Sequence, residues 1–398
     1  MRIATAHSFD SAIDQLAQRQ SQLDEAQLRL TSGKRVMRAS DDPVDAARAE
    51  RALAAVSRAA TSLRSLEASR SAMTQLESAL GDAGDLLQTA REAIVAGGNA
   101  SYDSTQRQML AGQIRGLRDQ LLAVANRDDG AGGYLLGGQG SSAPPFLDSA
   151  GGVQYVGTRG ANSADPATEM PMTMDGAATW MSASTGNGVF QTQSVTSNGS
   201  AWIDTGSVTN PAAITGSSYQ VQFSVAAGVT TYSVLKGGAA TAMTNIAFVP
   251  GQAIQFDGMS FTISGQPSNG DEFDIVPSHP TLSVFDALDK AANDLAAPTQ
   301  TGGAIAQATS ANLRNLDSVL ARMLGSRATA GEALIRIDAI GNRLDSASLN
   351  GQTERSKAED LDMATAISDF QSKQTGYSAA LKTYASVQRM SLFDYIKT

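Results

Sequence analysis

Apolar residues recur at alternating intervals of three and four over most of this chain. In the first thirty residues the positions with this spacing are Phe9, Ile13, Leu16, Gln20, Leu23, Gln27 and Leu30. The spacing places one stripe of side chains along one face of an α-helix, as in coiled coils. Gly33 can adopt the left-handed conformation that ends a helix, and Asp42 followed by Pro43 is a strong helix start. The pattern predicts two long helices separated by a break at 33–42.

The same spacing continues beyond the break. From Pro43 to about Val95 the expected helix carries the stripe Met73, Leu76, Leu80, Ala83, Leu87, Ala90 and Ile94. A shorter helix is expected to carry Leu110, Ile114, Leu117, Leu121 and Val124. The glycine-rich and proline-rich stretch NRDDGAGGYLLGGQGSSAPPF then ends helical structure.

Helical spacing returns in the last third of the chain. It runs from Leu313 to Leu344, and a break is expected near Gly351. The final stripe consists of Met363, Ile367, Phe370, Gln374, Tyr377, Leu381, Tyr384 and Gln388. Because both ends of the chain carry such a stripe, each end can supply the partner that the other needs.

Between about 150 and 280 apolar and polar residues alternate singly, which is the period of a half-buried strand. Asp257-Gly258 is a preferred pair for a two-residue hairpin turn. The sequence therefore predicts a mainly α protein with a β insert. Both chain ends form a long antiparallel coiled coil or helical bundle, and a β-rich domain lies between them. The expected segments are 1–40 and 353–398 for the terminal helices, 41–140 and 281–352 for the bundle, and 141–280 for the β domain.

Charge is unevenly distributed along the chain. The net charge is −9, and residues 141–280 contribute −7 of it, from nine acidic side chains against Arg159 and Lys236. An acidic segment disfavours nucleic acid as a partner, because a phosphate backbone binds Lys and Arg. The nearly neutral flanks suit packing against copies of the same chain, because repulsion between copies is small there.

The N-terminal stretch MRIATAHSFDSAIDQ reaches Asp10 and Asp14 before any apolar run develops. We therefore expect no cleaved secretory signal. The sequence also contains no stretch of about 18 apolar residues, so we expect no membrane insertion. The absence of Cys excludes disulfides and thiolate chemistry. Either a cytoplasmic protein or one exported without a cleaved signal fits these features.

No arrangement of side chains indicates catalysis. His7 and His279 lack a spaced partner for nucleophile–base chemistry. Asp271, Glu272, Asp274 and His279 come nearest to a metal cluster, but the three acids are at positions typical of solvated turn and strand residues. We expect a protein that is not an enzyme and that holds neither cofactor nor metal.

The break at 33–42 is basic. Lys34, Arg35 and Arg38 fit an exposed charged loop, and the alternatives are an anion site and a contact with a neighbouring subunit. We take Lys34 and Arg35, together with the stripe residues of both terminal helices, as candidates for a subunit interface.

Two stretches carry a resemblance to a known family. LTSGKRVMRASDDPVDAARA at 30–49 resembles the N-terminal signature of the bacterial flagellin superfamily, and AEDLDMATAISDFQSKQTGYSAALKTYASVQRMSLFDYI at 358–396 resembles its C-terminal signature. Within that superfamily, GGYLLGGQGSSAPPF, ISGQPSNGDEFDIVPS and the ending SLFDYIKT are similar to the hook–filament junction family, the third hook-associated proteins.

The resemblance implies an extracellular structural subunit of the bacterial flagellum, exported unfolded through the type III export apparatus with an export chaperone. It implies a junction adaptor whose partners are copies of itself, the first hook-associated protein and flagellin. In the family, paired terminal helices line an inner tube, a helical bundle surrounds them and the β domain faces outward. A flagellin, and a secreted coiled-coil adhesin acting through the β insert, are the alternatives.

Four glutamines occupy positions of the terminal stripes: Gln20, Gln27, Gln374 and Gln388. A buried polar residue in a coiled coil fixes register at a cost in stability. We expect these glutamines to fix the register between the two terminal helices. The alternative is that they are exposed residues near fraying helix ends.

Overall fold

The computed structural model describes residues 2–99, 101–165, 170–298 and 301–396, without the side chains of residues 2–9 and 387–396. Its α-helices are α1 (Arg2–Ser32), α2 (Pro43–Gly97), α3 (Ser104–Ala125), α4 (Gly176–Trp180), α5 (Val284–Ala296), α6 (Gly302–Glu359) and α7 (Met363–Ile396). The chain divides into two compact units. We call Met1–Arg64 with Gly341–Thr398 the terminal unit, and Ser65–Ile340 the central unit.

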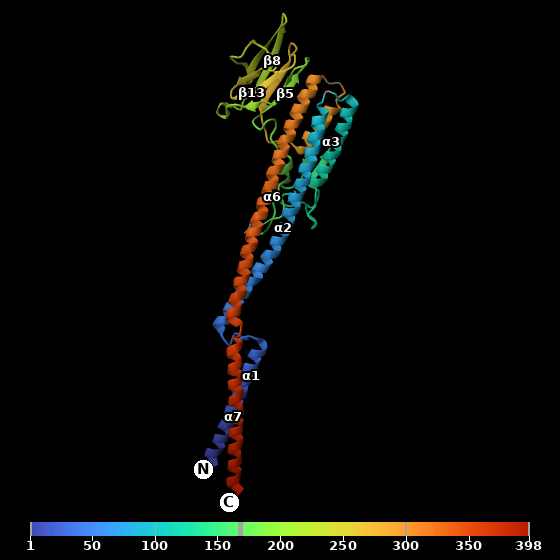
Figure 1. Ribbon diagram of the computed structural model, residues 1–398. Coiled ribbons are helices and arrows are strands. Elements are labelled where there is room, and N and C mark those ends of the chain that lie inside the picture. Colours follow the sequence, from blue (N-terminus) through green and yellow to red (C-terminus); the bar gives the residue numbers. More distant parts are fainter. Residues whose placement is uncertain (1, 100, 166–169, 299–300, 397–398) are drawn as a thin grey trace. The chain divides into compact units, whose positions relative to one another are not determined.

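The strands all lie in the central unit. They are β1 (Phe146–Ser149), β2 (Gly152–Tyr155), β3 (Ser163–Asp165), β4 (Met170–Pro171), β5 (Phe190–Thr196), β6 (Trp202–Ile203), β7 (Ser207–Val208), β8 (Tyr219–Ala226), β9 (Val229–Lys236), β10 (Ala239–Ala240), β11 (Ile246–Ala247), β12 (Ala253–Phe256), β13 (Met259–Ser264) and β14 (Glu272–Pro277), with a short 3-10 helix at Pro211–Ala213. The expected fold class, mainly α with a β insert between long helices, is confirmed (Figure 1).

Local signals end α1 and start α2 where the sequence predicts. Gly33 has a φ of 68°, and its N–H donates to the Arg29 carbonyl at 2.9 Å, which closes the last turn of α1. The Asp42 carboxylate accepts the N–H of Val44 at 3.1 Å and that of Asp45 at 3.0 Å. These bonds satisfy two of the N–H groups that the first turn of a helix leaves unpaired.

The helices of the central unit pack through the predicted stripes. All seven α2 stripe residues from Met73 to Ile94 are buried. Ion pairs join α2 to α6 along the edge of this packing, with Arg70 to Asp338 at 2.7 Å and Arg91 to Asp317 at 2.9 Å. The apolar stripe thus supplies the burial, and the charges flank it where they remain hydrated.

From β5 to β14 the β domain forms two antiparallel sheets around one core, while β1–β2 and β3–β4 are separate two-stranded sheets. One sheet has the order β10-β9-β8-β14-β5, with β11 also paired to β9, and the other has β12-β13-β6, with β7 also paired to β13. Asp257 and Gly258 both have positive φ, 44° and 78°, and connect β12 to β13 as predicted. The core between the sheets includes Phe190, Val221, Phe223, Phe261 and Phe273.

Arg118 attaches the β1–β2 hairpin to the helices. Its guanidinium bonds both carboxylate oxygens of Asp148 on β1, lies 3.4 Å from Asp289 on α5, and stands 5.9 Å from the Phe285 ring centroid. Only 8% of its side chain is exposed. The pKa of Arg118 is raised above its ordinary value because Asp148 stabilises the charged form.

The structure corrects the expectation that Asp271 is solvated. Its side chain is fully buried, and it accepts the N–H groups of Asn198 at 2.7 Å, Ser268 at 2.8 Å and Gly199 at 3.3 Å. Turns carry backbone N–H groups without partners, and burying them requires an acceptor. Asp271 supplies that acceptor for two turns that lie far apart in sequence.

The helix break expected near Gly351 is wrong. Helix α6 runs through Gly351 and ends only at Glu359. A β-carbon on Gly351 would lie 2.7 Å from Val56 Cγ2 on α2. Small buried residues line the same seam of the terminal unit, namely Ala49, Ala52, Ala59 and Ala358. Gly351 therefore permits close approach of two helices and does not end one.

Enlarging Gly351 should weaken the terminal unit. We expect Gly351→Leu to lower the free energy of unfolding by about 1–3 kcal/mol, because the new side chain must push the stiff Val56 aside. The matched control is Gly325→Ala on the same helix, where a β-carbon meets nothing within 4 Å. That change should stabilise by about 0.5–1 kcal/mol through helix propensity. Urea unfolding of both variants tests this, and a Gly351→Leu protein as stable as the parent would contradict the packing.

Candidate subunit interface at the paired chain ends

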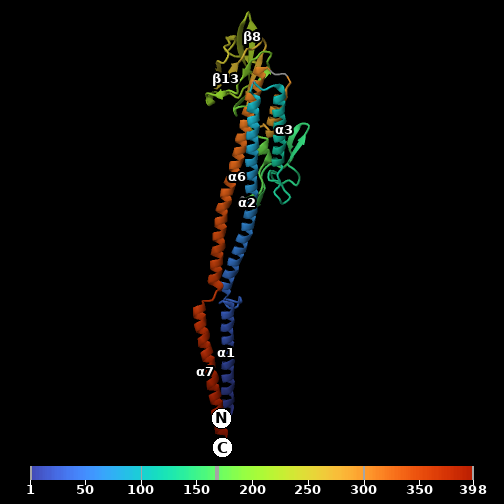
Figure 2. The ribbon, with the colours of Figure 1, turned by 45° about the vertical axis from the view of Figure 1, so that its right-hand side comes forward.

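The two ends of the chain form an antiparallel helix pair in the terminal unit. Figures 1 and 2 show α1 and α7 side by side, with the N-terminus near the C-terminus. Tyr377 Oη on α7 donates to Gln20 Oε1 on α1 at 3.4 Å. A β-carbon on Gly376 would lie 3.0 Å from Arg19 Nη1, so the Arg19 side chain on α1 reaches over Gly376 on α7. The chain ends therefore serve as partners for each other.

The contact faces are rotated slightly from the predicted stripes. The buried or half-buried residues of α1 include Ala12, Leu16, Leu23, Ala26 and Leu30, and those of α7 include Ala366, Phe370, Tyr377, Ala380 and Tyr384. Alternation by three and four is kept, but Ala12 and Ala26 take the places expected for Ile13 and Gln27. Small residues let the helix axes come closer than larger side chains would, which explains the rotation.

The glutamines lie outside the contact between the two helices. Gln20, Gln27 and Gln374 are exposed, and of these Gln20 reaches Tyr377 from the edge. The expectation that they fix register from within the seam is wrong for these three. Phe9 and Gln388 lie outside the residues whose side chains are described.

An apolar face remains exposed on both terminal helices; on α1 it lies beside the exposed Asp10 and Asp24. Large apolar residues on it keep much of their surface in solvent: Ile13 50%, Leu28 57%, Met363 46%, Ile367 44% and Leu381 43%. From Met363 to Ser386 the sequence of α7 contains only three charged residues, Asp369, Lys373 and Lys382. Depletion of charge with retention of apolar side chains is typical of the centre of a protein interface. The exposed residues of the predicted stripes thus form a surface of this kind.

A clasp joins the segment after α1 to the segment before α7. We define the clasp as residues 33–36 and 358–361. Its backbone bonds run from Arg35 N to the Glu359 carbonyl at 2.7 Å, and from Leu361 N to the Gly33 carbonyl at 2.9 Å. Lys34 and Asp360 pair across this short antiparallel bridge.

Lys34 and Arg35 fasten the clasp through charges. Arg35 donates to the Ala358 carbonyl at the end of α6 at 2.8 Å, and to Asp42 and Asp45 at the start of α2 at 3.3 and 2.5 Å. Lys34 Nζ lies 2.9 Å from Glu359 Oε2. Both cations thus have partners within the chain, and their role as contacts with another copy stays a prediction.

These contacts change the acidity of the clasp carboxylates. The pKa of Asp42 is held below its ordinary 3.8 by the N–H of Asp45, with a further contribution from Arg35. The pKa of Glu359 is held below 4.5 chiefly by the hydrogen bond from Lys34. Lowered pKa values mean that folding favours the ionised carboxylates.

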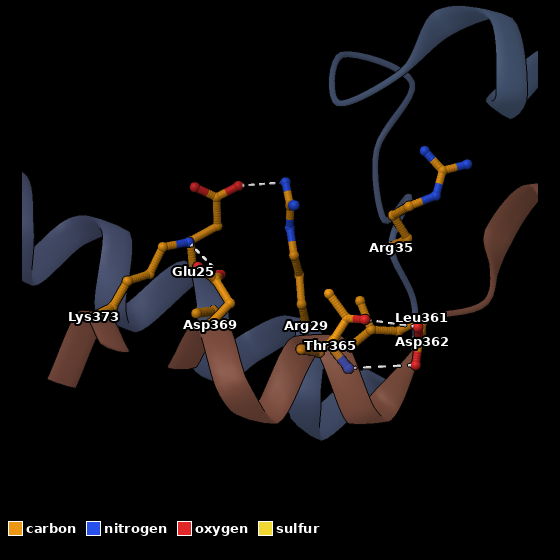
Figure 3. Close-up of a pocket in the computed structure, with 10 residues that line it drawn as sticks. Glu25, Arg29, Arg35, Leu361, Asp362, Thr365, Asp369 and Lys373 are labelled. Carbon is orange, nitrogen blue, oxygen red and sulfur yellow. Dashed lines mark hydrogen bonds and ion pairs between the residues drawn. The ribbon is translucent and has the colours of Figure 1, made fainter. Parts of the chain in front are cut away.

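A hollow of about 300 Å³ lies between α1 and α7 beside the clasp (Figure 3). Its walls carry two ion pairs, Glu25 with Arg29 at 2.6 Å and Asp369 with Lys373 at 2.7 Å. Arg35 points away from both pairs in Figure 3. Thr365 Oγ1 in the same hollow donates to Asp362 Oδ2 at 2.7 Å, and both lie at the start of α7, where they act as a helix cap. The charges of the hollow are thus used in local contacts, and its chemistry is that of a recess for a side chain.

Two features of the described residues bear on other functions. No group of three or more His, Asp or Glu side chains is placed to hold a metal ion. No helix within the described ranges is both long and apolar enough to cross a membrane.

Sequence reasoning missed the partners of the basic loop. Glu359 is 325 positions from Lys34, and nothing near either residue signals the other. Asp45, in contrast, is only ten positions from Arg35, so the charge that starts α2 and the basic loop are close enough in sequence to suggest their ion pair.

Removing Arg35 should loosen the clasp, because Ala358, Asp42 and Asp45 then lose their common donor. We expect Arg35→Ala to speed hydrogen exchange at the Leu361 amide several-fold, while Arg38→Ala in the same loop leaves it unchanged. Since the folded pKa values of Asp42 and Glu359 are depressed, their contribution is complete above the ordinary carboxyl values and is lost as the pH falls through the lower folded values. Exchange corrected for its intrinsic pH dependence should therefore accelerate in acid. Equal exchange in the two variants would show that Arg35 does not hold the clasp.

Comparisons with known proteins agree with these features. Residues 3–141 match the family model described as the bacterial flagellin N-terminal helical region. A flagellar hook-associated protein 3 of Salmonella typhimurium strain LT2 is 33% identical over 156 residues, which cover 38% of this chain and 48% of that protein. This match therefore spans about half the length of that relative.

Two further proteins match over more of their length. The flagellar hook-associated protein 3 of Escherichia coli strain K12 is 26% identical over 402 residues, the whole of both chains. The crystal structure of the flagellar junction protein FlgL from Legionella pneumophila has a TM-score of 0.65 and 26% identity, and the match covers 70% of this chain and 94% of that one. The resemblance found at the two chain ends is thus confirmed: the chain matches the flagellin N-terminal region over residues 3–141 and is similar along its whole length to a flagellar hook-associated protein 3.

Proposed function

We propose that this chain is a structural subunit of the bacterial flagellum that joins the hook to the flagellin filament. The observation that carries the proposal is the helix pair α1–α7, which leaves the large apolar side chains of Ile13, Ile367 and Leu381 exposed. Relatives named for hook association and for the flagellar junction support the place of that subunit.

The exposed face is the surface that contacts neighbouring copies of the chain. Apolar side chains in solvent lower the solubility of a free subunit, and burying them against a neighbour returns about 25 cal/mol per Å² of apolar area. Exposed Gln20, Gln27 and Gln374 can hydrogen-bond across the contact between copies. The free energy of burying this face is gained only when the subunit assembles. This fits a structural subunit better than an enzyme.

The partners follow from the position at a junction. The first hook-associated protein lies on the hook side, flagellin lies on the filament side, and copies of this chain complete the ring between them. An extracellular location requires export, for which a chaperone and the type III export apparatus are the expected partners.

Location along the flagellum tests the proposal directly. A label on this chain should give one spot per flagellum, where the filament meets the hook, and few copies relative to flagellin. Labelling along the whole filament would assign the chain to flagellin, and absence from isolated flagella would reject a flagellar role.

Charges placed on the exposed face should block assembly without unfolding the subunit. We expect Ile13→Lys and Ile367→Lys each to reduce incorporation into flagella at least about tenfold, because a lysine would be desolvated in the contact. Gln18→Lys is the matched control, because it places the same charge on an exposed position of α1 beside Asp14. Incorporation of all three variants at parental levels would remove this face from the interface.

A further inference from the structure

A second hollow lies in the central unit, between α6 and the loops that precede β5. Its volume is about 490 Å³, and its polar lining includes Arg314, Arg322, Ser182 and Asn187. The walls are fixed to each other, since Ser318 Oγ donates to the Ser184 carbonyl at 2.6 Å and Arg322 Nε to the Ala178 carbonyl at 2.7 Å. The hollow is therefore a built feature of this unit.

Two guanidinium groups of this hollow lack an acidic partner. Arg314 donates to Thr205 Oγ1 at 3.0 and 3.3 Å, and Arg322 donates to a carbonyl, but neither lies within ion-pair distance of a carboxylate in the part of the chain that the structure describes. Asp317, which also lines the hollow, is paired with Arg91. Each guanidinium has five N–H donors, so several remain for an incoming carboxylate.

This chain itself presents a matching pair of carboxylates. Asp85 and Glu92 are exposed on α2, on the side of the helix opposite the buried stripe, and neither has an ion-pair partner among the described residues. Seven residues separate them, which is about 10.5 Å along a helix; Arg314 and Arg322, eight residues apart, are about 12 Å apart along theirs. The two pairs thus match in both charge and spacing.

We infer that the Arg314–Arg322 hollow receives Asp85 and Glu92 of a second copy of this chain. All four residues lie in the nearly neutral flanks, where repulsion between copies is small and a pair of opposite charges can attract. A contact between two different surfaces of the same chain is head-to-tail, and it generates rings or helices of subunits. The inference rests on the proposed function, because it requires that copies assemble side by side.

Cross-linking in isolated flagella tests the contact, because the chain has no native Cys. Asp85→Cys combined with Arg322→Cys should give disulfide-linked multimers on mild oxidation, whereas either single variant should not. Glu332→Cys with Arg322→Cys is the control pair, with both positions exposed on α6. Cross-links equal to that control, or cross-links only to another protein, would overturn the second copy as occupant.

Charge reversal provides an independent readout. Arg314→Glu with Arg322→Glu should lower incorporation into flagella at least about tenfold, and adding Asp85→Arg and Glu92→Arg to that variant should restore it. Normal incorporation of the first variant, or no recovery in the second, would refute the contact. If the parental chain still labels the junction in that case, the proposed function stands and only this contact fails.

Discussion

The clasp between residues 33–36 and 358–361 is the constraint on which the terminal unit depends. The Gly33 and Glu359 carbonyls accept N–H groups from opposite segments, so the end of α1 and the start of α7 are fixed in one antiparallel register. The same register continues along the helix pair, where the Arg19 side chain lies next to Gly376 and Tyr377 donates to Gln20. Register is therefore set at the base of the helix pair by backbone bonds, and no polar residue inside the seam is needed to set it.

Because the clasp holds α1 and α7 at one end, their side chains can remain only partly buried along the rest of the pair. On α1 from Asp10 to Ser32 only Ala26 is buried, and no α7 residue from Met363 to Ser386 is. The α2 stripe of the central unit, by contrast, is buried throughout. Ordering a helix costs conformational entropy that half-buried side chains scarcely offset. The clasp keeps the ends together in the free subunit, and the apolar surface left exposed is available to the contact between copies that we propose.

Features encoded by adjacent residues were predictable, and features that join distant residues were not. Gly33, Asp42 and the Asp257-Gly258 turn act on their own backbone, so sequence alone located helix ends and a hairpin. The role of Gly351 depends on Val56, and that of Arg35 depends on Ala358. Periodicity identified which helices carry stripes. It did not identify which residues of α1 face α7, because small residues on both helices decide how closely the axes approach.

The β domain shows how an insert can fold on its own core and still have a fixed orientation. Its two sheets enclose an apolar core to which α6 contributes nothing. Polar contacts then join it to one side of α6, where Gln307 accepts the Ile203 N–H at 2.7 Å and Arg314 donates to Thr205. Polar contacts of this kind add little net stability, since both partners bond water when they are apart, but they are directional. Folding of the insert and its alignment with the helices are therefore separable properties, carried by different residues, and changes on the outer strands can alter the surface of the insert while its alignment on α6 is kept.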